Sequence, residues 1–183
     1  MNPSDAPVGD NGSEVAPRSP EDLPSVLVGL LTLRVAGAER VALDVVRGLH
    51  QDFAIRIATL QHGPPMPDGL PPLPPAGGLR DLLFGATDLV QTQLFLPGLA
   101  ARLRRIWDRQ TPWVHTVQYH NYESLRLGRV RKWMDHRWIF PGADTIVAAG
   151  DAVAASLPPL RAVKTIPNAI DLTRAEPSLA NPA

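Results

Sequence analysis

An unbroken apolar run begins the patterned part of the chain. Residues 26–31 read V-L-V-G-L-L, which is typical of a strand buried on both faces. After a short loop, apolar residues recur at the spacing of an amphipathic helix: Ala38, Val41, Ala42, Val45, Val46 and Leu49. A buried strand, a turn that contains glycine and an amphipathic helix form the first half of a βαβ unit.

Strand-like and helix-like segments alternate along the rest of the chain. The pattern predicts strands at residues 53–60, 88–94, 112–117, 144–149 and 161–166. It predicts helices at residues 79–84, 96–109, 122–140 and 151–157. The expected buried positions of the two longer helices are Leu99, Leu103 and Ile106 in the first, and Leu127, Val130, Met134 and Trp138 in the second. The alternation predicts an α/β fold with a doubly wound, mostly parallel, Rossmann-like sheet.

Composition removes several classes of protein. The chain is 44% hydrophobic, which is enough for a core, and 18 basic residues balance 18 acidic ones, so bulk charge gives no reason to expect nucleic acid as a partner. Cysteine is absent, which excludes thiolate chemistry. Residues 1–24 are rich in Pro, Ser, Gly and acidic residues, and we expect a disordered tail there and no signal peptide. No apolar run reaches the length of a membrane span, and we expect a cytoplasmic protein.

Polar and glycine-containing segments follow the predicted strands. They are residues 34–39, Gln91 with Gln93, residues 118–123, Gly150 with Asp151, and residues 168–171. Because the carboxyl ends of parallel strands share one edge of a sheet, these segments predict a ligand crevice. The backbone N–H groups at the start of the first helix would favour a phosphate there.

Two common nucleotide-binding motifs are missing. The first loop has Gly37 alone where a dinucleotide fold needs G-x-G-x-x-G, and the second strand ends A-T-L without an acidic residue. No G-x-x-x-x-G-K-[ST] occurs either. An oxidoreductase or a P-loop enzyme is therefore not expected.

Five motifs, in order, resemble the N-terminal, acceptor-side domain of family-4 glycosyltransferases, which are retaining enzymes of GT-B fold. The first, V-A-G-A-E-R-V-A-L-D (35–44), resembles the family's G-G-A-E-R loop and helix. D-L-V-Q-T-Q-L-F (88–95) and P-W-V-H-T-V-Q-Y-H-N (112–121) are similar to its D-V-V-H-T-H and P-V-V-H-T-V-H strands. A strand and helix at 143–157 and I-P-N-A-I-D at 166–171 complete the resemblance. It implies a domain at 25–171, followed at 172–183 by a tail or the start of an interdomain linker.

The resemblance also implies a function. A sugar would pass from a sugar nucleotide to a glycan or lipid-linked acceptor with retention, with no cofactor and no metal. By analogy, Ala36 and Gly37 would approach a phosphate or the acceptor through backbone N–H groups, and Gln118 would occupy the position of a sugar-contacting, catalytic His. The other candidate substrate-binding residues are Glu39, Gln93, His120, Asn121 and Gly150.

The chain departs from the family pattern in several places. Ala36 replaces a glycine, and Gln91, Gln93 and Gln118 replace histidines; an amide can bond a sugar hydroxyl but cannot titrate near neutral pH. The proline-rich stretch 61–78 suggests that the third strand region is shortened, and the paired glutamates of a donor-binding domain are missing. We therefore expect little transfer without a separate donor-binding domain. The alternatives are a non-catalytic remnant that binds a sugar, a nucleotide or a protein, and a standalone nucleotide-binding enzyme.

Several residues also have a purely structural interpretation. Glu39 could be an exposed carboxylate in the first turn of a helix, His115 a core histidine, and Asp151 a helix cap. His120 with Glu123 supplies too few ligands for a metal site. A basic run is interleaved with two tryptophans: Arg126, Arg129, Arg131, Lys132, Trp133, Arg137 and Trp138. This run could make peripheral contact with the anionic inner face of a membrane. We favour the alternative, in which the basic side chains form a solvated face and the tryptophans lie in the core.

Overall fold

Six parallel strands form one sheet at the centre of the molecule. The computed structural model describes residues 22–33, 37–61, 77–118, 127–160 and 162–167. The sheet order is β2-β1-β3-β4-β5-β6 and every neighbouring pair is parallel. The bounds are β1 Ser25–Leu30, β2 Ala54–Thr59, β3 Leu89–Gln93, β4 Trp113–Val117, β5 Thr145–Ala148 and β6 Val163–Thr165. The predicted fold class, a doubly wound parallel sheet, is confirmed.

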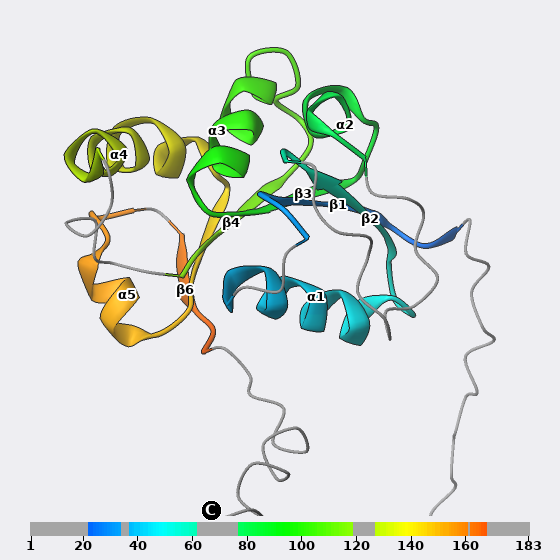
Figure 1. Cartoon of the computed structure of the whole chain (residues 1–183), viewed down its shortest axis with the longest axis horizontal. Helices are drawn as coiled ribbons and strands as arrows, with labels where there is room; N and C mark the ends of the chain where they lie inside the picture. Colours follow the sequence, from blue (N-terminus) through cyan, green and yellow to red (C-terminus); the bar gives the residue numbers. More distant parts are fainter. Residues whose placement is uncertain (1–21, 34–36, 62–76, 119–126, 161, 168–183) are drawn as a thin grey trace, which may run out of the picture.

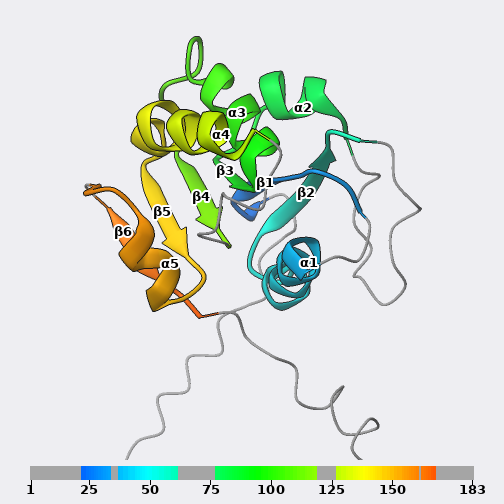
Figure 2. The same ribbon diagram turned by 60° about the vertical axis from the view of Figure 1, so that its left-hand side comes forward.

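Helices cover the sheet on both faces (Figures 1 and 2). One face carries α1 (Gly37–Leu49), and the other carries α2 (Leu79–Phe84), α3 (Phe95–Arg104), α4 (Gly128–Met134) and α5 (Asp151–Ser156), whose Val153 packs in the same cluster as Trp113. After α4 the chain continues through a π-helical segment, Asp135–Ile139, and a short 3₁₀ turn, Phe140–Gly142. The expected tails at 1–24 and 172–183 lie outside the described residues, apart from 22–24.

The direction of the chain across the sheet reverses between β1 and β3. From β1 the chain moves outward to β2, and from β2 it crosses back past β1 to β3, its other neighbour. In open parallel sheets, ligands bind beyond the carboxyl ends of the strands at such a reversal. The topology therefore puts the expected crevice beside the ends of β1, β3 and β4.

The described chain continues beyond the outer side of β2 for one residue. A single parallel bridge joins Gly77 to Ala58 there. The N–H of Gly77 donates to Ile57 O at 2.8 Å, and the N–H of Thr59 donates to Gly77 O at 2.8 Å. Within the described chain, this one-residue bridge is all that extends the sheet beyond β2; the predicted shortening concerns residues that lie mostly outside the described ones and stays a prediction. Most of the proline-rich stretch, 62–76, lies outside the described residues.

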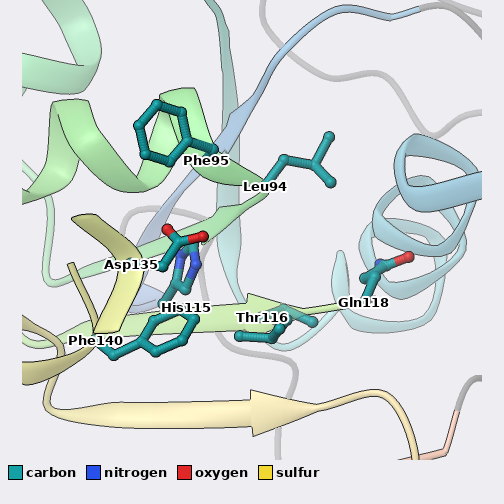
Figure 3. Close-up of a pocket in the computed structure, with 8 residues that line it drawn as sticks. Leu94, Phe95, His115, Thr116, Gln118, Asp135 and Phe140 are labelled. Carbon is teal, nitrogen blue, oxygen red and sulfur yellow. The ribbon is translucent and has the colours of Figure 1, made fainter. Parts of the chain in front are cut away.

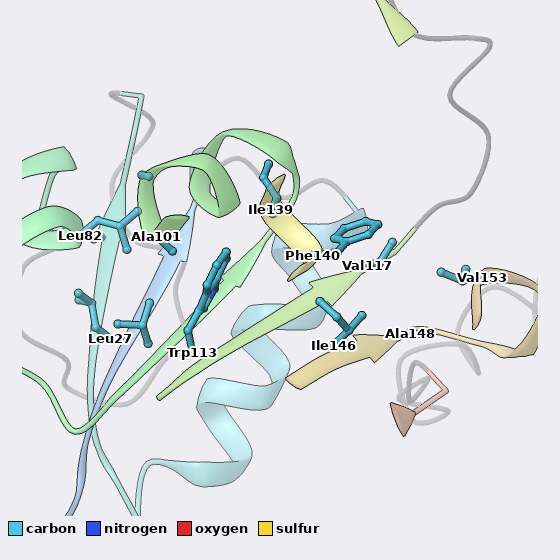
Figure 4. Close-up of a cluster of buried hydrophobic side chains, with 13 residues drawn as sticks. Leu27, Leu82, Ala101, Trp113, Val117, Ile139, Phe140, Ile146, Ala148 and Val153 are labelled. Atoms are coloured by element: carbon cyan, nitrogen blue, oxygen red, sulfur yellow. The ribbon is translucent and has the colours of Figure 1, made fainter. Parts of the chain in front are cut away.

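Two hydrophobic layers hold the helices against the sheet. Under α1, Val28 and Leu30 of β1 pack with Leu43 and Val46 of the helix. The opposite layer is larger and is built around Trp113 of β4, which is 1% exposed (Figure 4). This second cluster includes Leu27, Leu82, Ala101, Trp113, Ile139, Phe140 and Ile146. Strands that are buried on both faces explain why β1 reads as a continuous apolar run.

The predicted apolar side of the helix at 96–109 is confirmed at Leu99, which packs against the core, and is wrong at Ile106. Helix α3 ends at Arg104, and Ile106 beyond it is 59% exposed. The residues that α3 buries are Pro97, Gly98, Ala100, Ala101 and Arg104. Small residues let this helix lie close to β3 and β4, so the larger leucines remain at the margin of the contact.

The predicted buried face of the helix at 122–140 is also wrong. Leu127 is 69% exposed and Val130 is 52% exposed, whereas Asp135 and Ile139 are buried. The buried residues Gly128, Asp135 and Ile139 are seven and four positions apart, which is helical spacing, so the segment buries a different face from the one that carries Leu127 and Val130. Residues 122–126 lie outside the described chain.

Candidate functional site at the carboxyl edge of the sheet

Four of the predicted site residues lie at the carboxyl edge of the sheet. Gly37 begins α1, Gln93 ends β3, Gln118 follows β4, and Gly150 follows β5. The other expected residues of this edge, Ala36, His120 and Asn121, lie outside the described residues. The edge therefore brings together groups that are far apart in the sequence.

Two cross-strand hydrogen bonds form a polar ladder between β3 and β4. Gln118 donates from Nε2 to Oε1 of Gln93 at 2.7 Å, and Gln91 donates from Nε2 to Oγ1 of Thr116 at 3.2 Å. Gln93 is only 3% exposed, while Gln118 is partly exposed at the end of its strand. The ladder lies on the face that carries α1, because alternate residues of each strand point to the same side. Because the amide nitrogen of Gln118 is bonded to Gln93, the amide oxygen of Gln118 is positioned to accept a hydrogen bond from a ligand hydroxyl.

A second network lies on the opposite face of the same two strands. Trp113 donates from Nε1 to Oγ1 of Thr92 at 2.8 Å, and the same Oγ1 lies 2.9 Å from Nδ1 of His115. The hydroxyl of Thr92 therefore satisfies both the indole N–H and Nδ1 of the buried imidazole. Burial lowers the pKa of His115 to about 4. The structural interpretation of His115 as a satisfied core histidine is confirmed.

A narrow cavity opens beside the ends of β3 and β4 (Figure 3). Its water-accessible space is about 10 Å³, room for a single water-sized group. Its lining includes Leu94, Phe95, His115, Thr116, Gln118, Asp135 and Phe140.

Two of the residues that line this cavity were missed by the sequence prediction. Leu94, at the turn into α3, has φ 65°, which is a strained conformation for a side chain of this kind. Asp135 is 4% exposed, although its position in an apparently regular helix gives no sign that it is buried. The π-helical turn that buries it is not visible in the residue pattern.

Gly37 is exposed at the start of α1. Among the described residues, no atom lies within 4 Å of a Cβ added at Gly37. Glu39 lies in the first turn of the helix, as the structural interpretation expects, but it is 5% exposed, so its expected exposure is wrong. Helix α1 has 13 residues, and the N–H groups of its first turn make this end favourable for an anion.

The predicted cap of the helix after β5 is displaced by one residue. Gly150 is the N-cap, no side chain caps α5, and Asp151 is the first helical residue. The Asp151 carboxylate therefore lies in the first turn, where it can favour the helix dipole without acting as a cap. A Cβ added at Gly150 would also meet nothing within 4 Å.

Acidic, histidine and cysteine side chains do not gather in groups of three or more anywhere in the described part of the chain, so those residues offer no ready metal site. Among the described helices, none is long and apolar enough to cross a membrane.

A doubly wound parallel sheet with a polar edge at its point of reversal defines a Rossmann-like ligand-binding domain. The family model of Glycosyltransferase Family 4 matches residues 35–174, and the chain belongs to that family. Its fold is the one expected for the N-terminal domain of a GT-B glycosyltransferase. The order of the five motifs is thus explained by common descent with these enzymes.

Among solved structures, the chain is similar to the crystal structure of Anabaena Alr3699/HepE in complex with UDP and glucose. The TM-score is 0.58 at 12% sequence identity, which is a likeness of fold. The match covers 86% of this chain and 50% of that protein, so the chain spans half the length of this relative. A search of curated proteins finds no match.

Proposed function

We propose that this chain is the acceptor-side half of a glycosyltransferase that moves a sugar from a sugar nucleotide, with retention, to a glycan or lipid-linked acceptor. A separate donor-binding domain would complete the site, and without it the chain would be nearly inactive. In this proposal the functional domain is 25–171, and Gly37, Glu39, Gln93, Gln118 and Gly150, with Ala36, His120 and Asn121, line the groove between the two domains.

The observation that carries the proposal is the hydrogen bond from Gln118 to Gln93 at the edge where α1 begins. It holds a neutral amide at the end of β4, with its oxygen available to a hydroxyl group. The open start of α1, at Gly37, supplies backbone donors of the kind that bind phosphate. The neutral amide of Gln118 could bind the sugar of a sugar nucleotide, and the backbone donors at Gly37 could bind its diphosphate.

The similar HepE structure holds UDP and glucose, so UDP-glucose is the first donor to test for this chain. The decisive assay measures transfer to a glycan acceptor by this chain alone and with a donor-binding domain of the same family supplied as a second polypeptide. We expect transfer only in the mixture. Transfer by neither preparation, with a set of UDP-, GDP- and ADP-sugars, would remove the proposal.

Gln118→Ala tests the role of the ladder. We expect kcat/KM in the mixture to fall about tenfold, which is the loss of one hydrogen bond to the substrate. Gln110→Ala is the matched control, because Gln110 is an exposed amide away from this edge. Equal activity of the two variants would exclude Gln118 from the site.

A binding module without catalysis is the second candidate. It is favoured by the chemistry of the ladder, since Gln91, Gln93 and Gln118 bond to neighbouring polar groups and none of them can transfer a proton near neutral pH. Calorimetry and a turnover assay separate the candidates. A binding module binds a sugar or nucleotide without transferring or hydrolysing it. A standalone nucleotide enzyme turns over its nucleotide without a second domain.

A further inference from the structure

Two aromatic side chains stack on the molecular surface where α2 meets the end of α3. The rings of Phe84 and Trp107 have centroids 5.1 Å apart, and their planes are 17° from parallel. Phe84 is 63% exposed and Trp107 is 50% exposed. Since each ring covers one face of the other, the outer surfaces of the pair make a flat apolar area that is open to solvent. We call this pair the aromatic platform.

The aromatic platform is held in a fixed position. Trp107 donates from Nε1 to the carbonyl oxygen of Leu83 at 3.1 Å, which ties the indole to the end of α2. Arg104, which is 5% exposed, donates from Nη1 to the carbonyl oxygen of Gly85 at 2.9 Å, directly after Phe84 in the chain. A ligand that binds the two rings would therefore order little of the protein, which favours its affinity.

The aromatic platform lies away from the candidate site. Helices α2 and α3 both end beside the amino edge of the sheet, because each is followed by the loop that enters the next strand. The candidate site lies at the carboxyl edge, where β3 and β4 end. Helix α3 has 10 residues and is about 15 Å long. A ligand that reached both places would have to be an extended chain.

We propose that the aromatic platform binds the pyranose rings of a glycan chain. The apolar C–H groups on the face of a pyranose are attracted by the negative face of an aromatic ring, and the hydroxyls around its rim need hydrogen-bond partners. Arg80 supplies donors, since it is exposed and lies four residues before Phe84, on the same side of α2. The chain belongs to Glycosyltransferase Family 4, a class of protein whose substrates contain sugar rings. The identification of the bound glycan as the acceptor rests on the proposed function.

The size of the aromatic platform favours a sugar over a protein partner. A stable protein interface covers about 800 Å² on each side. An aromatic side chain contributes about 150–250 Å² when it is wholly covered, and the two rings already cover part of each other. Ile106, which is 59% exposed beside Trp107, does not close this gap. A pyranose ring, by contrast, is about as large as one aromatic ring.

The test is calorimetry of the full chain, without a donor-binding domain, against cellohexaose, maltohexaose and chitohexaose. We expect at least one of these hexasaccharides to bind. Trp107→Ala should lower the affinity about tenfold, because it removes one of the two rings. Phe84→Leu should also lower it, since leucine is apolar but has no ring. Trp107→Phe keeps a ring and should retain most of the affinity.

Trp133→Ala is the matched control. Trp133 of α4 is 63% exposed, so its favoured interpretation as a core residue is wrong, and α4 lies on the other side of α3 from α2 (Figure 1). This variant should bind the hexasaccharide as the parent chain does. Absence of binding to all three hexasaccharides, or equal losses in the Trp107→Ala and Trp133→Ala variants, would overturn the proposal. So would self-association or vesicle binding that Trp107→Ala abolishes, because a second copy or a membrane would then cover the platform.

Failure of this proposal and failure of the proposed function are separate results. Glycan binding that Trp107→Ala weakens, without transfer when a donor-binding domain is supplied, would remove the proposed function and leave the platform as a glycan-binding site. Transfer in the mixture, with glycan binding that Trp107→Ala leaves unchanged, would remove the platform alone.

Discussion

Gly98 of α3 lies directly against the ring of His115 in β4. A Cβ added at Gly98 would be 2.7 Å from Cε1 of His115 and 3.1 Å from Cγ2 of Ile139. The absence of a side chain at this position lets α3 approach the sheet beneath the candidate site. The close contact and the hydrogen bond between Thr92 Oγ1 and Nδ1 together hold the imidazole in place.

Gly98→Ala should therefore destabilise the fold. The added methyl has no space between the buried ring and Ile139, and overpacking of this kind costs about 1–3 kcal/mol. Gly48→Ala in α1 is the control, because a Cβ there meets nothing within 4 Å. It should raise stability by up to about 1 kcal/mol through helix propensity. Urea unfolding of both variants measures the difference, and equal effects would contradict the packing argument.

Thr92→Val should also destabilise the protein, although the two side chains have nearly the same shape. The change removes the hydroxyl that accepts from Nε1 of Trp113 and leaves a buried indole N–H without an acceptor. The expected loss is about 1–3 kcal/mol in the free energy of unfolding. Thr165→Val, on the exposed strand β6, is the control and should change stability little. A neutral result for Thr92→Val would mean that the bond contributes nothing to stability.

His115 should make stability depend on pH in the weakly acidic range. Its pKa is about 4 in the folded chain, because burial disfavours the charged ring, and its ordinary value is 6.5. Between these values the unfolded chain binds a proton that the folded chain does not, so stability falls as the pH is lowered from about 6.5 to 4. The full effect is about 3 kcal/mol. NMR titration of the His115 ring measures its pKa directly, and an ordinary value would refute the prediction. In His115→Gln, the free energy of unfolding should depend less steeply on pH.

Arg104 joins α2 to α3. Its Nη1 donates to Gly85 O at 2.9 Å, and its Nε and Nη2 donate to Oδ2 of Asp108 at 2.9 and 2.7 Å. Arg104→Met should cost about 1–3 kcal/mol, because the partly buried Gly85 carbonyl and Asp108 carboxylate lose their donors. Arg80→Ala, an exposed arginine of α2, is the control and should stay within about 0.5 kcal/mol of the parent chain.

The same substitution at Arg104 should change the titration of Asp108. Burial acts to raise the pKa of Asp108, but hydrogen bonds from Thr111 and the Arg104 guanidinium outweigh it and lower the pKa to about 2. Without the guanidinium, this pKa should rise toward its ordinary value. NMR titration of Asp108 in Arg104→Met measures the shift, and an unchanged pKa would show that Thr111 alone holds the carboxylate.

The strands and the order of the motifs were predictable from the residue pattern. The apolar run at 26–31 and the alternation that follows it are local signals, and each predicted strand lies within a residue or two of the observed one. The polar residues after the strands also predicted the edge that holds Gln93 and Gln118. Their hydrogen bond was not predictable, because it depends on the register between β3 and β4.

By itself, the sequence determined the class of fold and the edge of the sheet at which its polar residues gather, since hydrophobic periodicity reports which sides of each segment avoid water. Only the tertiary structure decided which residues of α3 and α4 face the core. Close packing placed small residues under α3, and the segment from α4 onward buries Gly128 and Asp135 while Leu127, Val130 and Trp133 face solvent. Such choices depend on the space left by neighbouring elements, which no local pattern contains.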